Sequence, residues 1–162
     1  MSIERSKYKL EKEILKVSAI EEIIKKALIC RLGLSDGENP YIVPLSFGYK
    51  DKTLYFHSAA KGKKIDIMRK NPRVCFEIDI NSKIIKAEDA CKWDIRYQSV
   101  IGYGKAVLLQ NTDEKREALK IIMSQYSDRT HHFIEKKVQK AAVVKVEIVG
   151  MTGRQSGSDP SF

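Results

Sequence analysis

Residues 54–72 read Leu54-Tyr55-Phe56-His57-Ser58-Ala59-Ala60-Lys61-Gly62-Lys63-Lys64-Ile65-Asp66-Ile67-Met68-Arg69-Lys70-Asn71-Pro72. The pattern predicts a short strand that passes through a Ser/Gly turn into a helix, which two lysines begin and Asn-Pro ends. Free backbone N–H groups, the positive end of the helix dipole, a hydroxyl and two ammonium groups then lie within about one helical turn. The junction is therefore a candidate phosphate-binding site, and an ordinary solvated, Lys-rich helix start is the alternative.

The composition indicates one folded domain with a basic surface. The chain has 162 residues, of which 43% are hydrophobic, so it is long enough to bury a substantial core. Its net charge of +9 arises from 30 basic and 21 acidic residues that are interleaved along the whole chain. Such a surface favours anionic ligands, and we expect neither a nucleic-acid partner nor a membrane partner.

Cysteine usage and the first residues predict a cytoplasmic protein. Cys30, Cys75 and Cys91 are odd in number and widely spaced, so we expect reduced thiols and no zinc site. The chain begins with charged residues rather than with the apolar core of a signal peptide. No segment approaches the roughly 18 apolar residues that would span a membrane.

The order of the expected elements favours an antiparallel barrel. We expect an N-terminal arm over residues 1–17, a folded domain over 18–154 and a flexible tail over 155–162. A capping box at residues 18–21 opens a short helix, and residues 28–35 and 41–49 form a hairpin. Further strands are expected at 53–58, 73–80, 97–109 and 142–149, and a loop is expected over 81–92. We expect helices at 63–70 and 131–139, and a further helix that Thr112 or Asp113 caps. The fold class is β (α+β), with about six antiparallel strands and peripheral helices.

Three polar residues occupy strands that are otherwise apolar. Arg31, Gln98 and Ser99 need partners if they are buried, and a ligand is one such partner. Solvent-facing positions on their strands are the alternative. Pro44 removes a hydrogen-bond donor from the middle of a strand, so we place it at an edge or a bulge where a ligand can approach the backbone.

Several motifs together resemble a known family. They are Pro44-Leu45-Ser46-Phe47-Gly48-Tyr49, Tyr55-Phe56-His57-Ser58-Ala59 with Gly62-Lys63-Lys64, Asn71-Pro72-Arg73-Val74-Cys75-Phe76, Tyr97-Gln98-Ser99-Val100-Ile101-Gly102-Tyr103-Gly104 and Gly150-Met151-Thr152-Gly153-Arg154. Residues 20–154 resemble the flavin-binding split barrels related to pyridoxamine 5'-phosphate oxidase, and most of all the nitroimidazole-resistance (Nim-type) branch. The C-terminal Arg-x-His pattern of pyridoxamine phosphate oxidase itself has no counterpart here, so vitamin B6 oxidation is not expected.

The resemblance implies a cofactor, an assembly and a set of binding residues. It implies a homodimer of split barrels with FMN at the subunit interface and the phosphate at the 58–64 turn. Residues 43–47 would border the isoalloxazine ring, and Gln98 and Ser99 would lie near the ribityl chain or the ring. The implied cofactor-binding residues are Arg31, Val43, Pro44, Leu45, Ser46, Phe47, His57, Ser58, Gly62, Lys63, Lys64, Gln98 and Ser99.

The resemblance also implies an oxidoreductase. FMN would pass electrons from a transient NAD(P)H, or from another donor, to a small electron-poor acceptor such as a nitroaromatic compound. His57 is the candidate catalytic residue, as a proton donor or a substrate-positioning group, although it could equally hydrogen-bond the cofactor or a neighbouring carbonyl. Trp93 and Tyr97 could cover a ring or belong to an interface. We expect no metal site, because the adjacent His131 and His132 would point in different directions on a helix.

Other functions fit parts of the same sequence. A non-catalytic flavin-binding or flavin-storage protein would share the phosphate turn, and a split barrel could instead bind haem or a deazaflavin. A small basic barrel that binds single-stranded nucleic acid would need exposed aromatic platforms. Tyr41, Phe47, Tyr49 and Tyr55 could serve as platforms, but their alternation with apolar residues favours a core or an interface.

Overall fold

The computed structural model describes residues 12–157. The expected N-terminal arm up to residue 11 and the expected tail from residue 158 lie outside the described residues. Residues 13 and 14 form a short strand, β1 (Glu13–Ile14), that pairs with Arg154 and Gly153 of the last strand, β8 (Ala142–Ser156). Strand β8 therefore runs two residues into the region that we expected as a tail.

The described residues form a sheet of eight strands with four helices. The strand pairs β1–β8, β2–β3, β2–β6, β4–β5 and β5–β8 are antiparallel. The strand order is β3-β2-β6-β7-β8-β5-β4, with β1 on β8. The remaining strands are β2 (Cys30–Ser35), β3 (Pro40–Leu45), β4 (Gly48–Lys50), β5 (Thr53–Ser58), β6 (Arg73–Ile85) and β7 (Asp94–Leu108). The helices are α2 (Val17–Lys26), α3 (Lys63–Lys70), α4 (Thr112–Ser124) and α5 (Glu135–Lys140). The predicted fold class is confirmed, with more strands than the six or so expected.

The chain divides into two compact units. Within the described residues, one unit comprises residues 12–27, 78–101 and 152–157, and the other comprises residues 28–77 and 102–151. Strands β6, β7 and β8 contribute residues to both units. We call the unit of residues 12–27, 78–101 and 152–157 the small unit and the other the large unit, and we describe each by itself.

The large unit begins with the predicted hairpin of β2 and β3. Arg31 lies opposite Pro44, and β3 ends the strand order, so Pro44 occupies a sheet edge as predicted. Residues 41–49 do not form the single strand that we expected, because the chain leaves the ladder between β3 and β4. A Cβ on Gly48 would lie 2.6 Å from backbone atoms of Ile121 and Ile122, so only glycine lets β4 pass this close to α4.

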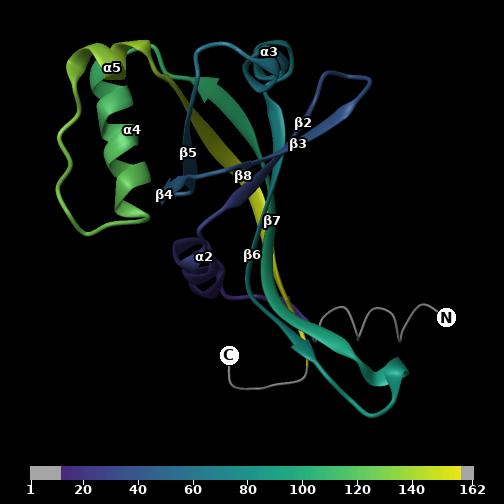
Figure 1. The fold of residues 1–162 in the computed structure, drawn as a ribbon. Coiled ribbons are helices and arrows are strands. Elements are labelled where there is room, and N and C mark those ends of the chain that lie inside the picture. Colours follow the sequence, from purple (N-terminus) through teal and green to yellow (C-terminus); the bar gives the residue numbers. More distant parts are fainter. Residues whose placement is uncertain (1–11, 158–162) are drawn as a thin grey trace. The chain divides into compact units, whose positions relative to one another are not determined.

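Strand β5 is fixed on both sides. A two-residue turn joins it to β4, and the turn residues Asp51 and Lys52 have φ values of 49° and 55°. On its other side β5 pairs with β8, where His57 lies opposite Val143 and Ser58 lies opposite Ala142. Helix α4 covers β4 and β5, and α5 packs near one end of α4 (Figure 1).

Two predicted helix starts are wrong by a few residues. Helix α4 is capped by Asn111, whose Oδ1 accepts hydrogen bonds from the N–H groups of Asp113 and Glu114 at 2.8 and 3.1 Å. We had placed the cap at Thr112 or Asp113, because all three residue types cap helices well. Helix α5 begins at Glu135 rather than near residue 131.

In the small unit, α2 buries one apolar face, as Ile20, Ile23 and Ile24 are at most 5% exposed. The predicted capping box is wrong. The N-cap is Lys16, whose carbonyl accepts the N–H groups of Ala19 and Ile20 at 3.0 and 3.2 Å, so Ser18 lies inside the helix.

The expected loop over residues 81–92 is also partly wrong, since β6 continues to Ile85 and residues 90–92 form a 3₁₀ turn. This end of β6 is largely exposed, and an exposed strand leaves no apolar alternation to detect. None of the helices within residues 12–157 is long and apolar enough to cross a membrane.

Candidate functional site

The junction of β5 and α3 has the geometry that the sequence predicts. Helix α3 begins at Lys63, and its N-cap is Gly62, with a φ of 133° and no side chain that caps the helix. A Cβ at Gly62 would meet nothing within 4 Å, so the space beside the N-cap is open. The first N–H groups of a helix have no acceptor within it, and they lie at the positive end of the helix dipole.

The Ser58 hydroxyl is a buried group without a partner. Its Oγ is inaccessible to solvent and makes no hydrogen bond with any group among residues 12–157. Ser58 shares a strand face with Leu54 and Phe56, which are 0% and 2% exposed. An unsatisfied buried hydroxyl costs about 1–3 kcal/mol, so this oxygen is suited to a ligand that supplies the missing hydrogen bond.

The two lysines at the start of α3 differ in their surroundings. The Nζ of Lys63 lies 4.8 Å from the ring centroid of Tyr41, on the β2–β3 hairpin. Its charge also helps to lower the pKa of Asp36 in that hairpin, although the N–H groups of Asn39 and Glu38 are the main cause. Lys64 is half-buried. The structure therefore places Ser58, Gly62, Lys63 and Lys64 at one junction.

Arg31 and residues 43–47 lie together on the β2–β3 hairpin. Arg31 pairs with Glu77 at 2.9 Å, so its charge is partly neutralised by the protein itself. Pro44 and Ser46 are exposed, Val43 and Leu45 are half-buried, and Phe47 is fully buried. A ligand on this edge would meet the backbone and side chains of residues 43–46.

Tyr126 is a residue of this region that sequence reasoning missed. The Phe47 N–H donates to the Tyr126 hydroxyl at 2.7 Å, and that hydroxyl donates to the Leu28 carbonyl at 3.0 Å. Burial raises the pKa of the Tyr126 phenol, so the hydroxyl keeps the proton that it donates. Tyr126 thus fixes the segment that ends β3. It lies 79 residues from Phe47 in sequence, and no local motif marks it.

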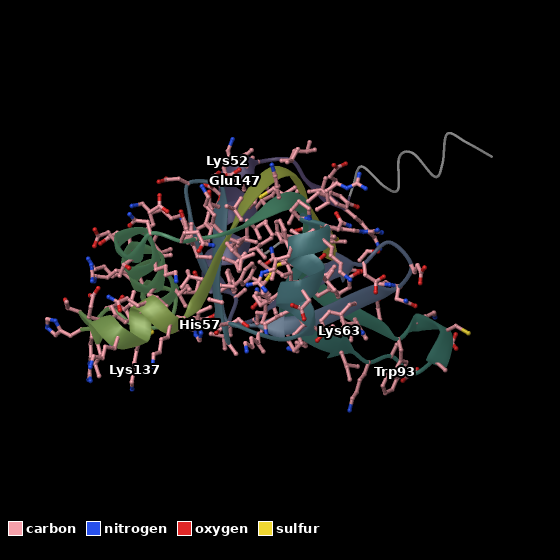
Figure 2. The ribbon with its side chains drawn as sticks, turned by 90° about the horizontal axis from the view of Figure 1, so that it is seen from above. Lys52, His57, Lys63, Trp93, Lys137 and Glu147 are labelled. Carbon is pink, nitrogen blue, oxygen red and sulfur yellow. The ribbon has the colours of Figure 1, made fainter. Side chains whose placement is uncertain are left out.

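His57 faces away from Ser58. Consecutive side chains of a strand point to opposite faces, and His57 lies on the face of β5 that α4 and α5 cover. There it lines a cavity of about 450 Å³ together with residues of both helices. Figure 2 shows His57 at the end of β5 on the side of α5, which carries Lys137. The candidate catalytic residue and the candidate phosphate anchor are therefore on different faces of one strand.

Gln98 and Ser99 belong to the small unit, whereas the other predicted site residues belong to the large unit. Ser99 lines a cavity of about 390 Å³ with Tyr97 and Arg154. Gln98 points to the opposite face of β7, where its Oε1 accepts a hydrogen bond from Asn81 at 3.1 Å. Only Ser99 of this pair opens into that cavity.

Trp93 and the two adjacent histidines lie apart from the junction of β5 and α3. The Trp93 indole N–H donates to the Ala87 carbonyl at 2.8 Å. His132 lines the same cavity as His57, whereas His131 lines a different one. Residues 12–157 contain no group of three or more His, Cys, Asp or Glu side chains that could hold a metal ion.

Comparison with known proteins identifies related chains. The family model described as pyridoxamine 5'-phosphate oxidase matches residues 16–155. A proposed 5-nitroimidazole antibiotic resistance protein from Bacteroides thetaiotaomicron is 35% identical, with a TM-score of 0.80 over 88% of this chain and 86% of its own. No curated protein matches the sequence.

Two more distant structures share the fold. The flavocytochrome Anf3 from Azotobacter vinelandii has a TM-score of 0.78 at 16% identity, over 93% of this chain and 72% of its own. An FAD-binding protein from Mesorhizobium loti has a TM-score of 0.64 at 23% identity, over 88% of this chain and 96% of its own. At these identities the likeness extends to the fold alone.

We predict that Ser58→Ala affects stability and ligand binding in different ways. The ligand-free variant should keep or gain up to about 1 kcal/mol in the free energy of unfolding, because an unsatisfied buried hydroxyl is removed. Its affinity for FMN, the phosphate ester that the sequence resemblance implies, should fall about tenfold. Urea denaturation and a fluorescence titration measure the two effects.

The matched control is Ser124→Ala, whose hydroxyl donates to the Ile121 carbonyl at 2.8 Å on α4. It should leave FMN affinity unchanged. Equal FMN affinity of wild type and Ser58→Ala would show that the hydroxyl does not contact the ligand.

Proposed function

The chain belongs to the pyridoxamine 5'-phosphate oxidase family, and from this membership we propose that it is an FMN-binding oxidoreductase. The observation that carries the proposal is the buried, unpartnered Ser58 hydroxyl at the junction where α3 begins with Lys63 and Lys64. A phosphate monoester suits this junction, because it accepts hydrogen bonds from the hydroxyl and the helix N–H groups while two ammonium groups balance its charge.

The choice of a flavin is supported by the family, whose fold is shared by a flavocytochrome and an FAD-binding protein. The Bacteroides protein at 35% identity is connected with 5-nitroimidazole resistance, which supports nitroaromatic compounds as the acceptor class. The turn at residues 58–64 resembles the phosphate-binding turn of the FMN-binding split barrels, and this resemblance favours FMN over a dinucleotide.

Two groups of residues would contact the cofactor, one at its phosphate and one at its ring. Ser58 and the first N–H groups of α3 would donate hydrogen bonds to phosphate oxygens, with Lys63 and Lys64 neutralising their charge. Residues 43–46 would border the ring, on a segment that the Tyr126 hydroxyl holds in place. When bound, FMN would supply the transfer of electrons from a nicotinamide donor to an electron-poor acceptor.

His57 would act on the substrate rather than on the phosphate. Its imidazole lies on the face of β5 opposite to Ser58, beside the cavity that α4 and α5 line. At that position it could donate a proton to a reduced nitro or carbonyl group.

We also propose that the protein acts as a homodimer. In the small unit, Ile84, Trp93, Ile95 and Ile101 are 57%, 50%, 52% and 44% exposed. Ile95 and Ile101 share one face of β7 with Tyr97 and Ser99. A face with this much exposed apolar surface suits an interface between subunits. Light scattering on the purified protein should give twice the 18.5 kDa chain mass, and the mass of a single chain would contradict the proposal.

The first test of the function is the visible spectrum of the purified protein. We predict flavin absorption bands, either as isolated or after FMN is added, and loss of these bands when NADPH or NADH is added without oxygen. A nitroaromatic acceptor should then restore them. Bands that persist with both donors would favour a flavin store or another donor, and failure to bind FMN would overturn the proposal.

The second test places the phosphate. Lys64→Glu puts a like charge beside the phosphate, so we predict that FMN affinity falls at least about 100-fold, while circular dichroism shows an unchanged fold. Lys70→Glu makes the same charge change in the last turn of the same helix and should alter affinity by less than about threefold. Equal losses in the two variants would indicate a general charge effect and no phosphate site at Lys64.

A further inference from the structure

We propose that the cavity between α4, α5 and the end of β5 is a second binding site, for a small apolar monocarboxylate. It lies entirely within the large unit and measures about 450 Å³. Small-molecule sites commonly have volumes of about 300–1,000 Å³. The proposal rests on the lining of this cavity, and His57 is the residue that it shares with the proposed flavin function.

The cavity wall accounts for the apolar part of this ligand. Leu119 and Met123 line it from α4, and Phe133, Ile134 and Val138 line it from α5 and the segment before it. Ile134 is the N-cap of α5 and is 62% exposed, so a large apolar side chain faces solvent beside the cavity. An apolar ligand body would remove this surface from water, and this burial favours binding.

The polar groups of the cavity account for the negative charge of the ligand. They are His57, His132 and Lys137, and no acidic side chain is among the lining residues. Within residues 12–157 no carboxylate forms an ion pair with Lys137. The ammonium group and the imidazoles can therefore donate hydrogen bonds to a carboxylate on the ligand.

Glu135, the acidic residue on the same helix as Lys137, already has other partners. Glu135 pairs with Arg116 of α4 and also accepts a hydrogen bond from the Gln139 side-chain amide at 3.2 Å. Arg116 pairs in addition with Asp113 at 2.6 Å. This network joins α4 to α5 and engages the Glu135 carboxylate away from Lys137, so the positive charge at the cavity stays available to a ligand.

The cavity is separate from the phosphate anchor. His57 is its only contribution from β5, and Ser58 points to the other face of that strand. A ligand in the cavity would therefore neither contact the Ser58 hydroxyl nor meet the first turn of α3. The two sites can be tested independently in the same protein.

The experiment compares a carboxylate with its uncharged counterpart. We predict that 1-naphthaleneacetate binds the purified full-length protein at least about tenfold more tightly than 1-naphthaleneacetamide, as measured by calorimetry. Lys137→Gln should remove most of that difference, because the amide analogue does not depend on the charge. Ile134→Glu, at an exposed position, should weaken the acid more than the amide by charge repulsion.

Lys136→Gln is the matched control, because Lys136 lies on the same helix and does not line the cavity. This control variant should leave both affinities unchanged. When 1-naphthaleneacetate is added to the wild-type protein, the backbone amide shifts in NMR spectra should change around Met123, Ile134 and Val138. Equal binding of acid and amide, equal effects of Lys136→Gln and Lys137→Gln, or no binding at millimolar ligand would each overturn the proposal. Loss of acid binding in Lys64→Glu would instead place the acid at the phosphate anchor and also overturn it.

Discussion

Side chains alternate along β5, and this alternation separates the two candidate sites of the large unit. Strand β5 is held between β4 and β8, and α4 packs over one of its faces. Because the register is fixed, Ser58 turns its hydroxyl to the buried face while His57 turns to the helical side. A slip of one residue would exchange the two side chains, exposing Phe56 and removing the hydroxyl from the junction with α3.

Much of the fold follows from the sequence because burial leaves a periodic pattern. The apolar residues of the hairpin and of β5 alternate, and those of α2 and α3 recur every three or four positions, as their buried faces require. The predicted antiparallel class is confirmed. The misses fall where burial gives no signal, as at the exposed end of β6, or where neighbouring residues cap equally well, as at Asn111, Thr112 and Asp113. The break before Gly48 depends on contact with α4, which local sequence does not reveal.

The sequence predicts only the part of the candidate site whose residues are close together in the chain. Residues 58–64 lie at one strand-to-helix junction, so their sequence spacing determines their proximity. Tyr126 acts on residue 47 through a distant hydroxyl, and Gln98 turns away from Ser99 because of strand alternation. The cavity beside His57 depends on how α4 and α5 pack, and the sequence showed those helices only as separate amphipathic segments.

The central claim is that a phosphate group anchors the ligand at Ser58 and the start of α3. The most direct measurement compares the affinities of FMN and riboflavin, which share the ring and the ribityl chain and differ in the phosphate alone. We predict that FMN binds at least about 100-fold more tightly, a difference of about 2.7 kcal/mol. Equal affinities would show that the phosphate contributes nothing and would contradict the anchor.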